Sequence, residues 1–446
     1  MPILPIDTGR YGSPEMRLVF EEQTRLQKWL DVESAVARAQ AALGIIPKEA
    51  AEEIAKKANT KVVTVERCKE IERETSHDLM AMVLALTEKL PPEAGKYVHF
   101  GLTSYDVEDT ATALQFRDAF NILESKMGVL KSLLRSLVKD NQATLMPGRT
   151  HGQQAGVITL GLKFAVWLEE IRRHLHRLDQ LRERALVGKV LGLVGTGAAL
   201  GKDALQVQER TLQILDLKPA GVVTQIIQRD IHAEVVCYLA ILGSSLDKFA
   251  TEVRNLQRTE IGELMEPFDR DRQVGSSAMP AKRNPMLSER VSSLAKLLRG
   301  LTIPALENIP QWHERDLTNS ANERFVFPTT FILADEMLNT TIRVLKGLEV
   351  NPENMRRNLE LSGGLILAEN IVNKLVQAGA PRQEAHERVR KLSMKALDNR
   401  ESFSSVLKSD KFVSQKLKAT EIEEALDYRK YLGVADELIR RALNET

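Results

Sequence analysis

Apolar side chains recur every three or four positions along a long stretch of the chain that begins near residue 110. The residues on this face are Phe116, Phe120, Leu123, Met127, Leu130, Leu134 and Leu137. This is the spacing of helices that pack side by side in a bundle. We predict one helix from about Asp109 to Leu145, which Met146-Pro147-Gly148 would end because proline and glycine interrupt the helical repeat.

Four later stretches repeat in the same way, at residues 164–178, 231–256, 291–301 and 332–348. Together the five predict one elongated helix bundle, whose apolar flanks also suit association with further subunits. No period-two alternation persists, so little sheet is expected. We therefore predict an all-α fold of three helical domains. Their expected boundaries are residues 1–110, 111–362 with the central long-helix bundle, and 363–446.

Composition and charge narrow the class of protein. The 446 residues carry 62 Lys and Arg against 61 Asp and Glu, so the net charge is only +1. Near-neutrality argues against a surface made for nucleic acid or membranes, and any anionic ligand must be met by local charge. Cys68 and Cys237 are too few for a disulfide framework or a metal cage. No signal peptide or bilayer-spanning stretch is visible, so a cytoplasmic protein is expected.

The most unusual segment is the loop of residues 273–286. It contains Gly275-Ser276-Ser277, two prolines, Lys282 and Asn284 directly before a predicted bundle helix. Backbone N–H groups after the glycine, together with Lys282, could hold a carboxylate or an oxyanion. A serine there could act as a nucleophile, or as a base if its alkoxide were stabilised. A mobile connection with chance polar content would have the same composition.

Three histidines lie in glycine-rich or capping sequences. His151 is followed by Gly152 in a second loop, His77 precedes Asp78, and His99 lies just before Gly101. An exposed histidine is the usual general acid or base near neutral pH, although each of these could equally be a structural or helix-capping residue. No histidine has carboxylates or cysteines at metal-ligand spacing, so neither a metal site nor a cofactor is expected.

A third dense segment covers residues 311–324. Arg315, Ser320 and Arg324 could together grip a phosphate, because guanidinium groups match phosphate oxygens. A helix N-terminus with ordinary salt bridges would have the same pattern of residues. The glycine-rich stretch of residues 188–201 lacks the strand and βαβ frame of a dinucleotide loop, so a turn between bundle helices is the better interpretation.

The loop Gly275-Ser276-Ser277-Ala278-Met279-Pro280 through Lys282, Asn284 and Pro285 resembles the signature of the fumarase/aspartase superfamily. Within that superfamily its form, with Ser288-Glu289-Arg290 after it, is similar to the adenylosuccinate lyase family. Further matching blocks are Gly9 to Met16, Gly101 to Ser104, Gly148 to Gln153 and Trp312 to Arg324. The resemblance covers nearly the whole chain. It implies a homotetramer of helical subunits whose active sites combine loops from three subunits.

The resemblance also implies a reaction and its catalytic residues. Fumarate would be eliminated from adenylosuccinate, giving AMP, and from the succinylated aminoimidazole carboxamide ribotide of purine synthesis. Ser276 would be the general base and His151 the general acid that protonates the leaving nitrogen. Lys282 would stabilise the serine alkoxide and, with Asn284, the developing dianion. His77 would also belong to the catalytic set.

Further residues are implied as substrate contacts. Those for the phosphate and its surroundings are Arg10, Tyr11, Arg290, Arg315, Ser320 and Arg324. Those for the base and the succinyl carboxylates are His77, Asp78, Thr103, Ser104 and Gln225, with His99 in support. Ser76, Tyr105 and Ala281 depart from the usual family residues. At Ser76, which we include among the substrate contacts, an arginine is usual, so that contact is lost or supplied elsewhere.

Two alternatives remain. Another superfamily enzyme, such as argininosuccinate lyase, fumarase or a carboxymuconate cycloisomerase, would share the signature loop but would need no phosphate grip. A non-catalytic relative that keeps the scaffold, as lens crystallins do, would need neither Ser276 nor His151.

Overall fold

The computed structural model describes residues 3–444, and its secondary structure is almost entirely helical. The predicted all-α class is confirmed. The N-terminal helices are α1 (Pro14–Phe20), α2 (Glu22–Ala42), α3 (Lys48–Lys57), α4 (Val65–Thr75), α5 (Asp78–Thr87) and α6 (Pro92–Gly95). The long helices are α7 (Ser104–Asp140), α8 (Leu160–Ala185), α10 (Arg229–Leu256) and α13 (Ser320–Lys346), with α9 (Ala204–Leu215), α11 (Met286–Gly300) and α12 (Thr302–Glu307) between them. The C-terminal helices are α14 (Pro352–Glu360), α15 (Ala368–Gln377), α16 (Arg382–Asn399), α17 (Phe403–Ser409), α18 (Lys411–Ser414), α19 (Ala419–Ala425) and α20 (Ala435–Asn444).

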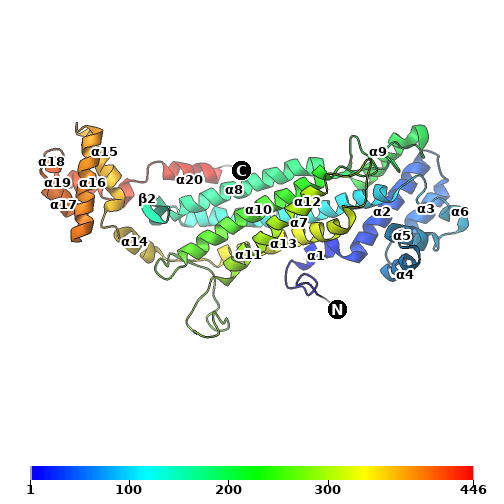
Figure 1. Ribbon diagram of the computed structural model, residues 1–446, viewed down its shortest axis with the longest axis horizontal. Coiled ribbons are helices and arrows are strands. Elements are labelled where there is room, and N and C mark those ends of the chain that lie inside the picture. Colours follow the sequence, from blue (N-terminus) through cyan, green and yellow to red (C-terminus); the bar gives the residue numbers. More distant parts are fainter. Residues whose placement is uncertain (1–2, 445–446) are drawn as a thin grey trace. The chain divides into compact units, whose positions relative to one another are not determined.

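The described chain divides into two compact units, each assembled from several stretches. The first contains the residues up to Met127, His174–Asp247 and Val291–Asn339. The second contains Gly128–Arg173, Lys248–Arg290 and the residues from Thr340 onward. The three-domain boundaries expected from the sequence remain a prediction. In Figure 1 the helices α2 to α6 of the first unit cluster together, as do α15 to α19 of the second.

Helix α7 carries the apolar stripe from which the bundle was predicted. Phe120, Leu123, Met127, Leu130 and Leu134 are fully buried. The helix starts at Ser104, earlier than predicted, and ends at Asp140 rather than near Leu145. The end was misplaced because residues 141–144 form a turn and the chain then becomes a strand.

The segment of residues 146–154, predicted to be a loop, is most of a β-hairpin. Strand β1 (Leu145–Thr150) pairs antiparallel with β2 (Gln153–Thr159) around the two-residue turn His151-Gly152. Both turn residues have positive φ, 54° and 76°, which a tight hairpin turn requires. The register shifts between Gly148 and Arg149, where the bulge absorbs the irregularity. The remaining strands, β3 (Val187–Gly188), β4 (Lys218–Pro219), β5 (Leu264–Met265) and β6 (Glu349–Val350), have two residues each.

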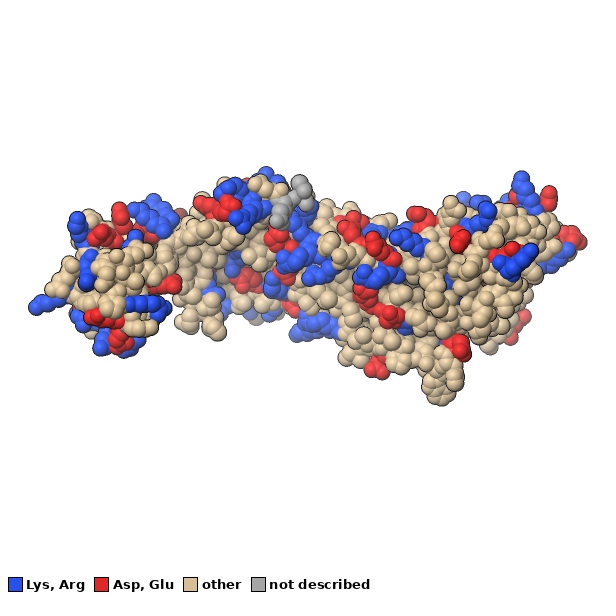
Figure 2. All heavy atoms as spheres, turned by 90° about the horizontal axis from the view of Figure 1, so that it is seen from above, with Lys and Arg blue, Asp and Glu red and all other residues tan. Residues whose placement is uncertain are grey.

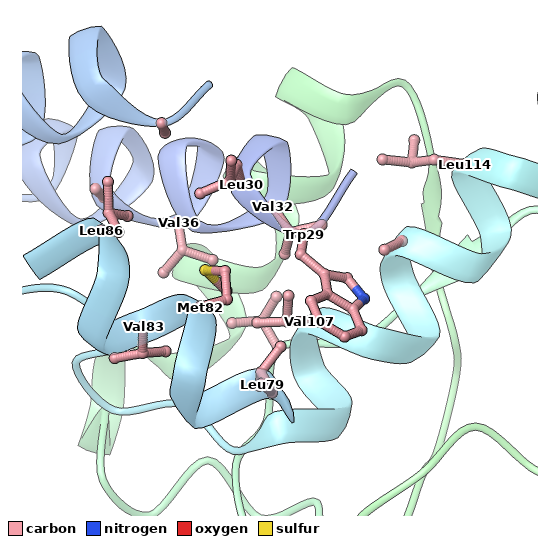
Figure 3. Packing of buried hydrophobic residues seen from close by; sticks show 14 of the residues in the cluster. Trp29, Leu30, Val32, Val36, Leu79, Met82, Val83, Leu86, Val107 and Leu114 are labelled. Atoms are coloured by element: carbon pink, nitrogen blue, oxygen red, sulfur yellow. The ribbon is translucent and has the colours of Figure 1, made fainter. Parts of the chain in front are cut away.

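The core of the first unit joins helices that are distant in sequence. Trp29 and Leu30 of α2, Leu79 and Met82 of α5, and Val107 of α7 pack together, as Figure 3 shows. In a second group Phe116 and Phe120 of α7 pack against Phe327 and Phe331 of α13 in tilted and edge-to-face arrangements, with ring centroids 5.2 to 5.6 Å apart between the two helices. This packing holds the N-terminal ends of α5, α7 and α13 in place within the unit.

The face of the described residues seen in Figure 2 has no large area of one charge. Lys and Arg side chains are interspersed with Asp and Glu on the face in Figure 2, as the net charge of +1 leads one to expect. Among the described residues, no helix combines the length and the apolar character needed to cross a bilayer.

Candidate active site

The turn between α4 and α5 presents His77 and Asp78 at the start of a helix. Ser76 ends α4 in the left-handed conformation (φ 54°), and His77 caps α5 by accepting a hydrogen bond from the N–H of Met80 at Nδ1, 3.4 Å away. Nε2 of His77 lies 3.4 Å from Oγ of Ser104 at the start of α7. The α5 and α7 termini are therefore adjacent, and they bring three predicted site residues, His77, Asp78 and Ser104, together.

Asp78 forms a salt bridge with Arg324, which is distant from it in the sequence. Nη2 of Arg324, on α13, donates to Oδ2 of Asp78 at 2.6 Å. Burial raises the pKa of the Asp78 carboxyl, but the charge and hydrogen bond of Arg324 outweigh burial, and the net effect is a lowered pKa. Asp78 is thus a carboxylate at neutral pH. Arg324 remains partly exposed, so part of its guanidinium group is accessible to a ligand.

The guanidinium group of Arg315 lies over an aromatic ring and has hydrogen-bond donors without a partner among the described residues. Its guanidinium carbon lies 3.6 Å from the centre of the Tyr105 ring, and Nη1 donates to Oε1 of Gln225 at 2.9 Å. Its Nε and Nη2 atoms are buried and have no hydrogen-bond partner among the described residues. Buried donors are nearly always satisfied, so these two point to an acceptor group that the protein itself does not supply. One edge of a guanidinium group matches two oxygens of a phosphate or carboxylate.

Tyr105, noted only as a departure from the family pattern, turns out to link the predicted phosphate residues. The hydroxyl group of Tyr105, whose ring faces Arg315, forms a hydrogen bond with Ser320. Burial raises the pKa of this hydroxyl group, so Tyr105 stays neutral. Tyr105, Ser320 and Arg324 line one cavity of about 130 Å³. Its other walls are aromatic side chains, among them Trp29 and Phe116, and the charged side chains of α2, α7 and α13.

A buried carboxylate shapes the Thr103–Ser104 turn. Asp106 accepts hydrogen bonds from the N–H groups of Thr103 at 2.8 Å, Leu191 at 3.0 Å and Gly192 at 3.0 Å, and it pairs with the fully buried Lys189. The glycine-rich stretch of residues 188–201 therefore serves to hold the start of α7. Neither Asp106 nor Lys189 was identified from the sequence, since nothing local marks them as partners.

His99 is fixed by a carboxylate of α2. Its Nδ1 lies 2.6 Å from Oε1 of the buried Glu33, and its own N–H donates to Oε2 of the same residue at 3.0 Å. The residue adopts the left-handed conformation with φ 61°. At the N-terminus, the Arg10 guanidinium lies 5.9 Å from the Tyr11 ring. Gly12 and Ser13, which follow, donate their N–H groups to Glu336 and Asp335 of α13.

An arginine-centred network that forms part of the cavity wall was also not identified from the sequence. Arg229 of α10 donates to Asp109 of α7 at 2.9 Å and to Glu323 of α13 at 2.9 Å, and all three are buried. Asp109 lies four positions before Ala113 on the core side of α7 and was used in the sequence only as a helix boundary. Long-range pairing of this kind leaves no local signal in a single sequence.

The second unit contains the other five predicted residues: His151, Ser276, Lys282, Asn284 and Arg290. His151 is exposed at the tip of the β1–β2 hairpin, which is anchored by Arg149. Nη2 of Arg149 donates to Oε1 of the buried Glu263 at 2.6 Å. The imidazole is thus presented to solvent by a rigid two-strand element, which suits a group that must exchange protons with a ligand.

The signature loop is closed on itself around Gly275. Nδ2 of Asn284 donates to the carbonyl oxygen of Gly275 at 2.8 Å. A Cβ atom at Gly275 would lie 2.0 Å from the carbonyl oxygen of Lys282, so only glycine fits there. Asn284 therefore has a structural contact in the loop in addition to its expected role toward the substrate.

The hydroxyl oxygen of Ser276 accepts two backbone hydrogen bonds within the signature loop. Its Oγ accepts hydrogen bonds from the N–H groups of Ala278 at 3.3 Å and Met279 at 3.2 Å. Two N–H dipoles directed at one oxygen favour negative charge on it. The Lys282 side chain in the same loop is exposed, and Ala281 beside it is exposed as well.

Helix α11 begins immediately after the loop and is capped by a buried carboxylate. Glu266 accepts hydrogen bonds from the N–H groups of Leu287 at 2.9 Å and Ser288 at 3.0 Å. This cap fixes the start of α11, the helix that carries Arg290 just after its first turn. The loop is therefore tied down at its C-terminal end, while most of its central residues are exposed.

Comparison with known proteins is consistent along the whole chain. Residues 9–300 match the family described as Lyase, and residues 364–442 match the one described as Adenylosuccinate lyase C-terminus. A protein of Pyrococcus abyssi named adenylosuccinate lyase is 50% identical over 444 residues, covering 100% of this chain and 98% of that protein. A fumarate lyase structure from Mesorhizobium sp. BNC1 has a TM-score of 0.91 and 32% identity over 100% of both chains. A 3-carboxy-cis,cis-muconate lactonizing enzyme from Pseudomonas putida has a TM-score of 0.89 and 33% identity, covering 99% of this chain and 98% of its own.

Proposed function

The chain belongs to the adenylosuccinate lyase family, and we propose that it eliminates fumarate from adenylosuccinate to leave AMP. We also propose the matching elimination from the succinylated aminoimidazole carboxamide ribotide. Both substrates carry a phosphate and a succinyl group attached through nitrogen. The enzyme would work in the cytoplasm as a homotetramer whose active sites combine loops of different subunits.

The observation that carries this substrate assignment is the pair of unpartnered, buried donors on Arg315. Nε and Nη2 form one edge of a guanidinium group whose carbon lies 3.6 Å from the centre of the Tyr105 ring, and the Tyr105 hydroxyl forms a hydrogen bond with Ser320. That edge offers two parallel N–H bonds to a phosphate. A nucleotide substrate supplies a phosphate, whereas argininosuccinate and a carboxymuconate offer only carboxylates.

The proposed mechanism assigns the two halves of the elimination to two residues of the second unit. Ser276, as the alkoxide, removes a proton from the carbon next to a succinyl carboxylate. The N–H groups of Ala278 and Met279 support the alkoxide before the proton moves, and Lys282 adds positive charge. The electron pair then forms the double bond of fumarate as the C–N bond breaks, and His151 donates a proton to the departing nitrogen.

The remaining predicted residues would bind and orient. Arg315, Ser320 and Arg324 would hold the phosphate, with Arg10, Tyr11 and Arg290 around it. Asp78, Thr103, Ser104 and Gln225 would contact the base and the succinyl carboxylates, with His77 and His99 near the reacting group. Charge-assisted bonds of this kind contribute about 1.5–3 kcal/mol each.

A second candidate comes from the solved structures, which include a carboxymuconate-lactonizing enzyme at a TM-score of 0.89. Purified full-length protein incubated with adenylosuccinate, and followed by absorbance for AMP and fumarate formation, separates the two. Conversion supports the proposal. A folded protein that leaves adenylosuccinate unchanged but turns over argininosuccinate or carboxymuconate would replace it.

The acid role of His151 has its own test. Because the residue has φ 54°, alanine would strain the turn, whereas asparagine tolerates the left-handed conformation. We expect His151→Asn to lower kcat by about 10²–10⁴-fold, the usual contribution of a general acid. His176→Asn on the exposed side of α8 is the matched control and should keep full activity. Equal activity of both variants would remove His151 from the mechanism.

A further inference from the structure

Glu108 is an acidic residue beside the phosphate-binding arginines that the proposed mechanism does not use. It lies on α7 four residues after Ser104, and its side chain lines the cavity together with Tyr105, Ser320 and Arg324. Among the described residues, the carboxyl group of Glu108 forms no hydrogen bond and no ion pair. Only its backbone carbonyl oxygen accepts a side-chain hydrogen bond, which the hydroxyl group of Thr112 donates. A carboxyl group close to several arginines is usually paired with one of them, so the position of Glu108 needs a physical explanation.

The neighbouring carboxylates each have an arginine. Arg324 binds Asp78 at 2.6 Å, and Arg229 binds both Asp109 and Glu323 at 2.9 Å. Burial raises the pKa of Glu323, but Asn319 and Arg229 both donate hydrogen bonds to its carboxylate. Glu108 therefore differs from its neighbours in lacking a bound cation.

The surroundings of Glu108 favour its neutral form. Burial is the main cause, and the negative charges of Asp78 and Asp109 add to it, whereas Arg324 and Arg315 oppose it only in part. Together they raise the pKa of Glu108 to about 8. An exposed glutamate has a pKa of about 4.3, so this carboxyl titrates in a range where ordinary glutamates are fully ionised.

Two other titratable side chains near the cavity, Tyr105 and His232, stay neutral between pH 7 and 9. Burial raises the pKa of Tyr105, which therefore stays neutral. Burial and the charge of Arg229 lower the pKa of His232 to about 3, so this ring is neutral as well. His77 lies 3.8 Å from Asp78 and is exposed.

Charge balance shows why the protonation state of Glu108 matters. Five charged residues line the cavity: Arg25, Arg324, Glu108, Asp109 and Glu323. Three more act on them, since Arg229 pairs with Asp109 and Glu323, and the charges of Arg315 and Asp78 act on Glu108. The set contains four arginines and four carboxyl groups. With every carboxyl ionised the set is neutral, and with Glu108 protonated it carries one positive charge. A phosphate dianion is attracted to the set in which Glu108 is protonated. When Glu108 is ionised, the dianion meets an additional negative charge.

We propose that Arg315 and Arg324 bind a phosphomonoester dianion with the Glu108 carboxyl protonated, so that binding to the ionised form takes up one proton from solution. The proton ends on Glu108, and no bond of the ligand changes. This inference rests on the proposed function, because it requires the phosphate of adenylosuccinate or AMP to lie against these arginines. Glu108 is then a positioning residue that couples nucleotide affinity to pH.

The size of the effect follows from the protonated fraction. With a pKa of about 8 that fraction falls roughly tenfold between pH 7 and pH 9, so the Kd for AMP should rise by about tenfold over the same interval. The ligand contributes nothing to this change, since a phosphomonoester with a second pKa of about 6 is dianionic throughout.

Calorimetric titration of the full chain with AMP tests the proposal directly. The titration is run at pH 7, 8 and 9, at each pH in two buffers of different ionisation enthalpy. We expect uptake of about half a proton per AMP bound at pH 8. Glu108→Gln cannot exchange that proton, so its Kd should change by less than about twofold from pH 7 to pH 9, with uptake near zero.

Glu124→Gln is the matched control, because Glu124 lies on the same helix and is paired with Arg182 at 2.6 Å, outside the cavity. It should keep the wild-type pH dependence. A wild-type Kd that does not vary with pH, or a Glu108→Gln variant that takes up protons as the wild type does, would overturn the proposal. The wild-type titration decides even if Glu108→Gln does not fold.

Failure of this inference is distinguishable from failure of the proposed function. If the protein converts adenylosuccinate but binds AMP without proton uptake, only the role of Glu108 is wrong. If it neither converts adenylosuccinate nor binds AMP at any pH, both are wrong.

Discussion

The Nδ1 atom of His99 lies 2.6 Å from Oε1 of Glu33, and the two residues are 66 positions apart in the chain. The backbone N–H of His99 binds the second oxygen of the same carboxylate, which fixes both the ring and the main chain. Burial lowers the pKa of His99, but the hydrogen bond and charge of Glu33 outweigh it, and the net effect is a raised pKa. With Nδ1 occupied by Glu33, Nε2 is the ring nitrogen left for a ligand.

We expect Glu33→Gln to lower the pKa of His99 and to destabilise the fold mostly at acidic pH. A histidine with a raised pKa stabilises the folded state fully below its unfolded pKa of about 6.5, and this contribution is lost as pH rises through the folded value. The loss should be about 1.5–3 kcal/mol near pH 5.5 and smaller above that window. Denaturant unfolding at several pH values measures it, with Glu93→Gln at the exposed Lys96 pair as the control. A difference that stays constant with pH would contradict the assignment.

Adjacent serines in the signature loop provide a matched pair of variants. Ser276→Ala removes the hydroxyl that accepts the N–H groups of Ala278 and Met279, and Ser277→Ala removes an exposed neighbour. We expect kcat to fall by about 10²–10⁴-fold or more in the first and to stay near wild type in the second, because only the first oxygen is assigned as the base. Steady-state kinetics on adenylosuccinate distinguishes them, and the reverse ranking would move the base to Ser277.

Arg324→Gln tests the phosphate assignment. The change removes a charge-assisted hydrogen bond to the ligand, so KM for adenylosuccinate should rise by roughly 10- to 100-fold. Arg184→Gln is the control, since Arg184 is about as exposed as Arg324 and is likewise paired with a carboxylate, Glu234. Weaker product inhibition by AMP should accompany the rise in KM. An unchanged inhibition constant for AMP would mean that Arg324 only holds Asp78.

Gly275→Ala should open the signature loop without unfolding the protein. The new Cβ would lie 2.0 Å from the carbonyl oxygen of Lys282, so the closure by Asn284 could not persist. Displacing catalytic groups by about 1 Å can cost on the order of 10²-fold in rate, and we expect at least that loss in kcat. Gly221→Ala, where an added Cβ meets nothing within 4 Å, should behave as wild type. Full activity of Gly275→Ala would show that the closed loop is not the working conformation.

The sequence by itself determined the elements whose signal is local. The three-four repeat through Phe120, Leu123 and Met127 identified α7, because helical periodicity is written in neighbouring residues. The order of residues from Gly275 to Asn284 identified the family, and a single glycine that tolerates no Cβ explains part of that constraint. Where local signals conflicted, prediction failed: the proline and glycine after α7 suggested a loop, but the chain forms a hairpin that presents His151.

Only the tertiary structure decided which distant residues share a site. Arg324 and Asp78 are 246 positions apart, and Arg315 meets Tyr105 and Gln225 only after α7, α10 and α13 have packed. The same packing surrounds Glu108 with charges that sequence order does not reveal. Contacts of this kind depend on the burial of faces on several helices at once, and burial in turn sets the pKa values on which the chemistry depends.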